Sequence, residues 1–112
     1  MVTREKMIEV VESVLGEYAS IPYRYGEIER QAVFDREKGR FLLMIDGWEN
    51  KKRAHGCIVD IRIRDNKIWI LRDGTEDGIA LEFERLGVPK SQIVLAWYPE
   101  EVRAEEEGYA VR

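Results

Sequence analysis

The fold is decided by residues 46–80, which read DGWENKKRAHGCIVDIRIRDNKIWILRDGTEDGIA. From Arg53 to Arg64 side chains alternate in the way typical of a strand with one buried face. Asp65 and Asn66 tolerate left-handed backbone angles, so they suit a two-residue hairpin turn, and Lys67 to Arg72 forms the returning strand. This register pairs Ile63 with Ile68, Ile61 with Ile70, and Arg62 with Trp69.

Strict alternation along the first of these strands assigns its side chains to two faces. His55, Cys57, Val59, Ile61 and Ile63 are predicted to share the core face. The same register, extended, brings Cys57 towards Gly74 and His55 towards Glu76.

A second hairpin precedes this one. Residues 29–35 read as a strand, residues 36–39 as a polar turn in which Gly39 needs a positive φ, and residues 40–48 as the returning strand. The run Phe41 to Ile45 has no polar interruption, which predicts a strand covered on both faces. Because the chain contains one long helix, a second copy or another protein is the natural cover for the second face.

Helices flank the hairpins. Apolar residues recur at three- and four-residue steps from Arg4 to Ala19, with Thr3 as N-cap and Pro22 as the stop. A second helix is predicted to follow the fourth strand, with Thr75 as its N-cap and Gly87 as its end. Residues 91–97 read as a closing strand. We therefore predict an α+β fold, with the N-terminal helix packed on an antiparallel sheet of about four to five strands.

Composition bounds the class of protein. The chain has 112 residues, 45% hydrophobic and 36% charged, which indicates one globular domain. No apolar run approaches the roughly 20 residues of a membrane span, and no signal-peptide pattern precedes the first helix, so we expect a cytoplasmic protein. The net charge of -4 argues against a general electrostatic grip on DNA.

His55 and Cys57 form the main candidate for chemistry. A cysteine beside a histidine is the minimum for thiolate catalysis, although strand residues two apart lie roughly 7 Å from each other. A small enzyme built on this pair is one alternative, and a core cysteine with a hydrogen-bonded histidine is the other. Asp73 and Glu76 extend the pair to a possible functional cluster, but their spacing matches no calcium loop. No metal or cofactor is expected.

Two kinds of surface could bind partners. Aromatic side chains are enriched in protein interfaces, and the candidates are Tyr23, Tyr25, Trp48, Trp69 and Trp97. A basic patch at one end of the sheet is the nucleic-acid alternative, built from Lys51, Lys52 and Arg53 with Arg62, Arg64 and Lys67. The acidic total favours an ordinary solvated face for these cations.

The sequence resembles the XisI family over nearly its whole length. The early motifs are Tyr18-Ala19, Ile21-Pro22-Tyr23, Tyr25-Gly26, Phe34-Asp35 and Gly47-Trp48. The later ones are Arg53, His55-Gly56-Cys57, Lys67-Ile68-Trp69-Ile70, residues 73–80, Gly87-Val88-Pro89-Lys90 and Ile93-Val94-Leu95. The segment from Trp69-Ile70 to Glu76 is the most specific, and residues from Pro99 onward resemble the family least.

The resemblance implies a cyanobacterial controlling factor for excision of the fdxN element, accessory to a separate recombinase. It also implies a XisH-type partner with a nuclease-like fold, which this chain would bind and regulate. A homo-oligomer, most simply a dimer, fits such a role. The family supplies no catalytic residues to carry over, so we expect no enzyme. Regulatory binding, a small enzyme and weak direct DNA contact remain open as alternatives.

Overall fold

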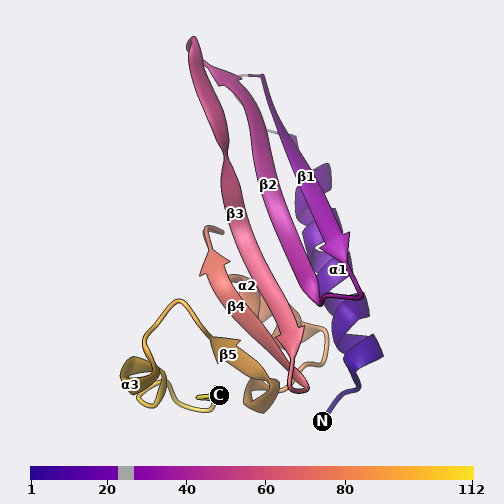
Figure 1. The fold of residues 1–112 in the computed structure, drawn as a ribbon, viewed down its shortest axis with the longest axis vertical. Helices are drawn as coiled ribbons and strands as arrows, with labels where there is room; N and C mark the ends of the chain where they lie inside the picture. The colour runs from indigo at the N-terminus through magenta and orange to yellow at the C-terminus, as the bar shows by residue number, and fades with distance from the viewer. Residues whose placement is uncertain (23–26) are drawn as a thin grey trace.

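The protein folds as one mixed sheet with helices on one side, in a computed structural model that describes residues 1–22 and 27–112 (Figure 1). The elements are α1 (Arg4–Ser20), β1 (Glu27–Asp35), β2 (Arg40–Glu49), β3 (Lys52–Arg64), β4 (Lys67–Asp73), α2 (Ile79–Arg85), η1 (Lys90–Gln92), β5 (Ile93–Leu95) and α3 (Glu100–Arg103). The strands lie in the order β1-β2-β3-β4-β5. The predicted α+β class is confirmed, with one correction: β5 pairs parallel to β4, because α2 and η1 carry the chain back across the sheet.

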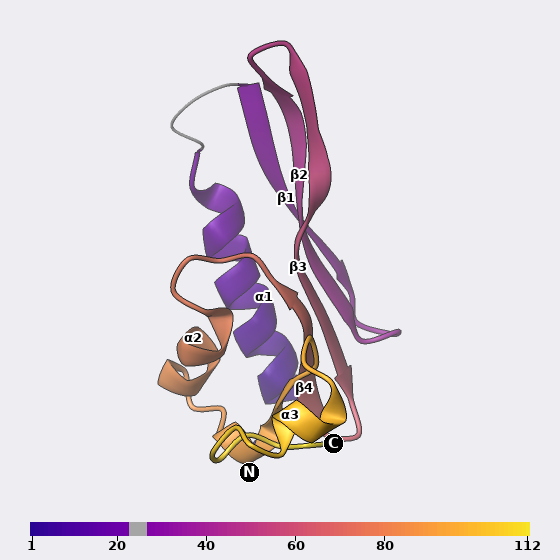
Figure 2. The same cartoon turned by 90° about the vertical axis from the view of Figure 1, so that its left-hand side faces the viewer.

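Both α1 and α2 lie against the same side of the sheet, as Figure 2 shows. Thr3 caps α1 as predicted, because its hydroxyl accepts a hydrogen bond from the backbone N–H of Lys6 at 3.1 Å. The apolar stripe of α1 packs on the core face of β2, β3 and β4, whose buried residues include Phe41, Ile61 and Ile70. Full burial of each large side chain contributes about 2 kcal/mol, so this interface supplies the main stability of the fold.

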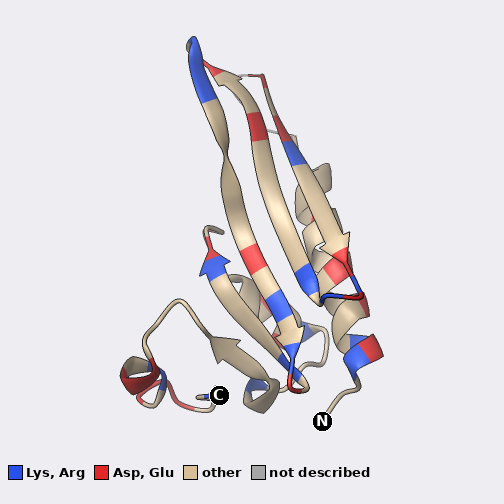
Figure 3. Cartoon of the chain, viewed as in Figure 1, with Lys and Arg blue, Asp and Glu red and all other residues tan. Residues whose placement is uncertain are grey.

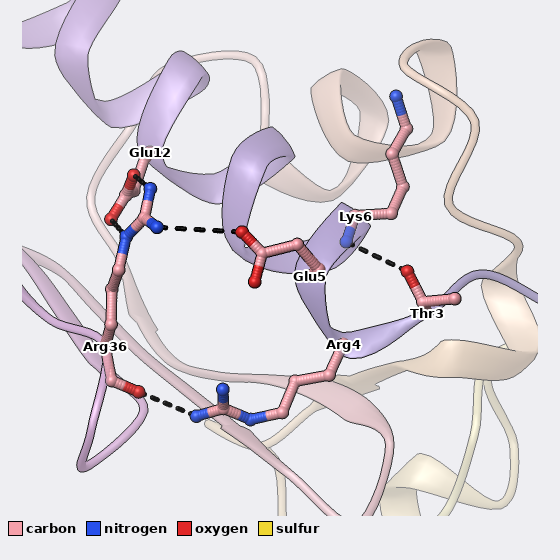
Figure 4. Close-up of polar contacts among 6 residues, drawn as sticks. All are labelled: Thr3, Arg4, Glu5, Lys6, Glu12 and Arg36. Atoms are coloured by element: carbon pink, nitrogen blue, oxygen red, sulfur yellow. Dashed lines mark hydrogen bonds and ion pairs between the residues drawn. The ribbon is translucent and has the colours of Figure 1, made fainter.

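Arg36, in the turn between β1 and β2, fastens the first turns of α1 to the sheet (Figure 4). Its guanidinium donates to both carboxylate oxygens of Glu12, at 2.9 and 2.7 Å, and lies 3.6 Å from Glu5. The Arg4 guanidinium donates to the backbone carbonyl of Arg36 at 2.7 Å. The helix is thus held by charge as well as by its apolar face.

Gln92 is a buried polar residue that sequence reasoning missed. Its amide accepts from the Val2 N–H at 2.6 Å and donates to the carbonyls of Val2 and Asn66, both at 3.0 Å. The side chain is 2% exposed. It therefore joins the N-terminal segment, the β3–β4 turn and β5 at one point.

The β3–β4 hairpin confirms the predicted turn and register. Asp65 and Asn66 have φ values of 51° and 59°, and Arg62 pairs with Trp69. The guanidiniums that lie over the Trp69 ring belong to Arg64 and Arg103, at 4.3 and 5.8 Å from the centroid. In the preceding hairpin Gly39 has the predicted positive φ, 68°.

Two β-bulges alter the predicted pairing, and the one in β3 makes the predicted face of His55 and Cys57 wrong. The first falls at Ile58, between the Leu43–Val59 and Met44–Cys57 pairs, and the second at Leu71, where the pairing between β3 and β4 shifts. Each extra residue reverses the alternation beyond it, so Cys57 pairs with Met44 on the outer face while Val59 stays in the core. The bulges also place Gly74 beside Ile58, through a 2.8 Å backbone hydrogen bond, instead of beside Cys57.

The start of the second helix also differs from the prediction. α2 begins at Ile79, after the N-cap residue Gly78. The first N–H of the helix is capped from a distance by the carboxylate of Asp73, which accepts from the backbone N–H groups of Ile79 at 2.8 Å and Thr75 at 2.9 Å. Thr75 does not cap the helix, because its hydroxyl donates to the same carboxylate.

The C-terminal segment runs along the edge of β5, and its Arg103 lies over the Trp69 ring on the outer side of β4. Ala110 bridges to Val94, and the Arg103 guanidinium donates to the carbonyls of Tyr98 and Val111. The hydroxyl of Tyr109 donates to the Glu84 carboxylate at 2.6 Å, which fastens the segment to α2. No described element covers the outer side of β1, β2 and β3, so the expected cover on both faces of β2 is not provided within the described chain.

Candidate functional site: the outer sheet face

The side of β1, β2 and β3 that no described element covers is here called the outer face, and it is turned to the viewer in Figure 1. Residues paired across antiparallel strands share a face, so the register defines its rows. From β1 through β2 to β3 these rows are Glu27–Trp48–Arg53, Glu29–Asp46–His55, Gln31–Met44–Cys57, Val33–Leu42–Asp60 and Asp35–Arg40–Arg62.

Charge is arranged across these rows and not at random. The β1 side carries acids, the β3 side carries mostly basic residues, and apolar side chains lie along β2 between them. Trp48 is 52% and Val33 46% exposed, whereas Leu42 and Met44 are half-buried by their neighbours. An exposed aromatic ring beside aliphatic side chains is typical of a protein-binding surface.

Some of the charges on the outer face are neutralised within the chain. Arg40 pairs with Asp60 at 3.1 Å. Arg53 pairs with Asp46, donates to the Gly47 carbonyl at 2.7 Å, and lies 5.5 Å from the centroid of the Trp48 ring. These contacts hold the guanidinium over the indole, while about half of the Trp48 side chain stays exposed.

Other charges on the outer face have no such partner. Among the described residues, Glu27, Glu29 and Asp35 of β1 form no ion pair, and Arg62 of β3 forms none either. Arg62 lies directly opposite Arg40, where like charges repel. The sequence signal for the β1 acids was their spacing of two residues on one strand, which the sequence-based prediction did not use.

The geometry argues against a thiolate at Cys57. Its thiol donates to the Val59 carbonyl at 3.1 Å, and burial, reinforced by the negative charge of Asp60, raises the thiol pKa. His55 is exposed on the same face, two residues away. This pair lines a shallow hollow together with Arg72 and Gly74.

The structure does not assemble the proposed cluster of His55, Cys57, Asp73 and Glu76. The Asp73 carboxylate is occupied in capping α2. Glu76 lines a different hollow, between α1 and the core side of the sheet, with Tyr18 and Arg30. Among the described residues no three His, Cys, Asp or Glu side chains are grouped so as to hold a metal ion.

The predicted partner-binding aromatics fall into three groups. Trp48 and Trp97 are exposed, Trp97 by 40%, and the Trp97 ring packs against that of Tyr98 at an interplanar angle of 44°. Trp69 is only 8% exposed beneath the C-terminal segment, so a partner cannot reach it in this arrangement. Tyr23 and Tyr25 lie outside the described residues.

The predicted basic patch is divided between two ends of the sheet, which corrects the expectation of a single patch. Lys51, Lys52 and Arg53 lie at the tip of the long β2–β3 hairpin, whereas the remaining three cations lie at the opposite end of β3 and the start of β4, as Figure 3 shows. The reason is the length of β3, whose first residue is Lys52 and whose last is Arg64. None of the described helices is long and apolar enough to cross a membrane.

Comparison with known proteins agrees with this architecture. The structure of a XisI-like protein from Anabaena variabilis matches with a TM-score of 0.89 and 30% identity, covering 98% of this chain and 100% of that one. The fdxN element excision controlling factor XisI from the same organism shares the fold at 23% identity and a TM-score of 0.79, covering 97% and 98% of the two chains. No curated protein matches the sequence significantly. The family model for XisI protein matches residues 1–111, and the chain therefore belongs to the XisI family.

Proposed function

We propose that this chain is an accessory factor that controls the site-specific excision of a DNA element by binding and regulating a XisH-type partner with a nuclease-like fold. The observation that carries the proposal is the XisI family match across residues 1–111. The exposed tryptophans and the raised pKa of Cys57 fit a binding module better than a thiol enzyme.

Co-expression with a XisH-type protein, followed by light scattering of the purified material, tests this role. The expected result is a stable complex of fixed stoichiometry. Trp97→Ala removes an exposed ring that lies away from the outer face, and it should weaken the complex if Trp97 anchors the partner. Cys57→Ser serves as the control and should leave the complex intact. Two separately eluting species would contradict the proposal.

The enzyme alternative makes an opposite prediction about Cys57. A catalytic thiolate is alkylated readily by iodoacetamide near neutral pH. A half-buried thiol with a raised pKa is expected to react more slowly than free cysteine. Rapid alkylation of the folded chain would favour the enzyme and count against the binding module.

Weak DNA binding is the second candidate, and the hairpin tip is the observation that favours it. Lys51 and Lys52 are exposed there, and neither forms an ion pair among the described residues. Phosphate contacts by these side chains would give binding at about 50 mM salt that falls steeply by about 200 mM. Fluorescence anisotropy with labelled duplex DNA distinguishes the two roles. A DNA-binding chain should raise the anisotropy, and the double variant Lys51→Ala, Lys52→Ala should abolish that rise. A module that binds only protein should leave the anisotropy unchanged.

A further inference from the structure

We propose that the outer face binds a second copy of this chain through a two-fold axis that runs along β2. This inference does not depend on the identity of the XisH-type partner. It rests on the order of charges across the rows, on which charges are already paired within the chain, and on the apolar residues between them.

The rows have opposite charge at their two ends. Glu27 and Glu29 of β1 share rows with Arg53 and His55 of β3, and Asp35 shares a row with Arg62. Rotation by 180° about an axis along β2, above the face, places β1 of one copy over β3 of the other and keeps each row against itself. Each acid of β1 then meets a basic or imidazole side chain of β3.

The alternative orientation is electrostatically unfavourable. An axis across the strands would place β1 over β1 and bring Glu27, Glu29 and Asp35 of the two copies together. Like charges brought together in this way repel and suppress the wrong arrangement. The charge order therefore selects the axis along β2, in which the strands of the two sheets run nearly aligned, as in other packed sheets.

The residues on the axis suit a self-contact. Leu42, Met44 and Trp48 of β2 would each meet their own counterparts, giving an apolar centre with an aromatic pair at one end. The two charged residues of β2 also face their counterparts, but both are already neutralised within the chain, Arg40 by Asp60 and Asp46 by Arg53. The charges that form no ion pair among the described residues would each face a side chain of the second copy that can neutralise them; they are Glu27, Glu29, Asp35 and Arg62.

Arg62 and Asp35 provide the sharpest test, because each lacks an ion pair among the described residues and the axis places them against each other. Arg62→Glu alone and Asp35→Arg alone each create two like-charge contacts per dimer. Each single change should raise the dimer Kd by about tenfold or more. An equimolar mixture of the two variants should form heterodimers, because opposite charges then face each other at both contacts.

The measurement is light scattering and sedimentation of wild type, each variant and the mixture, with circular dichroism to verify folding. Met44→Asp places a charge at the apolar centre and should raise the dimer Kd by at least about 30-fold. Leu81→Asp is its matched control, since Leu81 is exposed on α2, on the opposite side of the sheet, and the variant should stay dimeric.

Three results would overturn the inference. The first is a wild-type chain that is monomeric at about 100 µM. The second is a dimer that Met44→Asp leaves unchanged, which would place the interface elsewhere. The third is a mixture of Arg62→Glu and Asp35→Arg no more dimeric than either variant alone. If the wild type is monomeric and Met44→Asp instead abolishes the complex with the XisH-like protein, the outer face belongs to that partner.

Discussion

At the scale of single residues, Tyr109 should make stability depend on pH in the alkaline range. Burial, and then the hydrogen bond to Glu84, raises the pKa of Tyr109 from 10 to about 12. A group whose pKa is raised by folding stabilises the protein fully below its unfolded pKa, and that contribution is lost as the pH rises from about 10 to 12. Denaturation at a series of pH values should show this loss in wild type and a smaller loss in Tyr109→Phe.

Gln92 offers a second test at this scale. Gln92→Leu keeps a buried side chain of similar size but removes the hydrogen bonds to Val2 and Asn66, and should cost about 2 kcal/mol of unfolding free energy. Ser91→Ala, at the exposed neighbouring position, is expected to change stability by less than about 0.5 kcal/mol. Equal midpoints in urea for wild type and Gln92→Leu would show that the network adds nothing.

Residue-level chemistry was only partly predictable from the sequence. The single histidine and cysteine were visible as candidates, but their face was not, because it depends on a bulge at Ile58 that no alternation pattern reveals. Asp73 was recognised as a member of an acidic cluster, while its capping role depends on how the loop after β4 turns back. Gln92 left no sequence signal, since a lone glutamine before a strand is ordinary.

At the scale of elements, the β1–β2 pair contains a close approach that only glycine permits. A Cβ on Gly47 would lie 1.9 Å from the Glu27 carbonyl oxygen, so Gly47→Ala must push the two strands apart. We expect a cost of about 3 kcal/mol in unfolding free energy. Gly56→Ala, on the adjacent strand, has nothing within 4 Å of its added Cβ and should cost far less. Equal thermal stability of the two variants would contradict this account.

The attachment of α1 should respond to acid. Hydrogen bonds from Arg36 lower the pKa of Glu12 below 4.5, so this pair stabilises the fold above the unfolded pKa and the effect is lost as the pH falls through the folded value. Because the pair is largely solvated, its contribution at neutral pH is small. Glu12→Gln should be less stable than wild type at pH 7, and the difference should vanish as the pH falls below the lowered pKa of Glu12. Urea denaturation of both proteins at a series of acidic pH values measures this difference.

Elements with strong periodicity were the most predictable. The stripe of α1 and the Asp65-Asn66 turn follow directly from residue spacing, and both were located correctly. The start of α2 was placed too early because Thr75 resembles an N-cap in sequence, whereas Asp73 performs the capping. The basic residues were wrongly predicted to form a single patch, because β3 extends from Lys52 to Arg64 and holds the two groups of cations at its opposite ends.

At the scale of the whole molecule, the two sides of the sheet differ in how much of each is covered by other elements of the chain. The helices lie against one side and leave the far end of the β2–β3 hairpin beyond them, as Figure 2 shows. The C-terminal segment runs along the edge of β5 and reaches the outer side where Arg103 lies over Trp69 of β4. The uninterrupted apolar run in β2 indicated a cover on both faces, and none of the described elements supplies the cover on the outer face. The proposed self-association would use this surface, and the proposed XisH-type partner would then bind elsewhere on the chain.

The solution mass of the wild-type chain tests the central claim most directly. Multi-angle light scattering between about 1 and 100 µM should give a mass approaching twice 13.1 kDa as the concentration rises. Addition of the XisH-like protein should then give a heavier complex that retains two copies of this chain. A mass that stays at 13.1 kDa throughout, with no change when the partner is added, would contradict both the self-association and the proposed role.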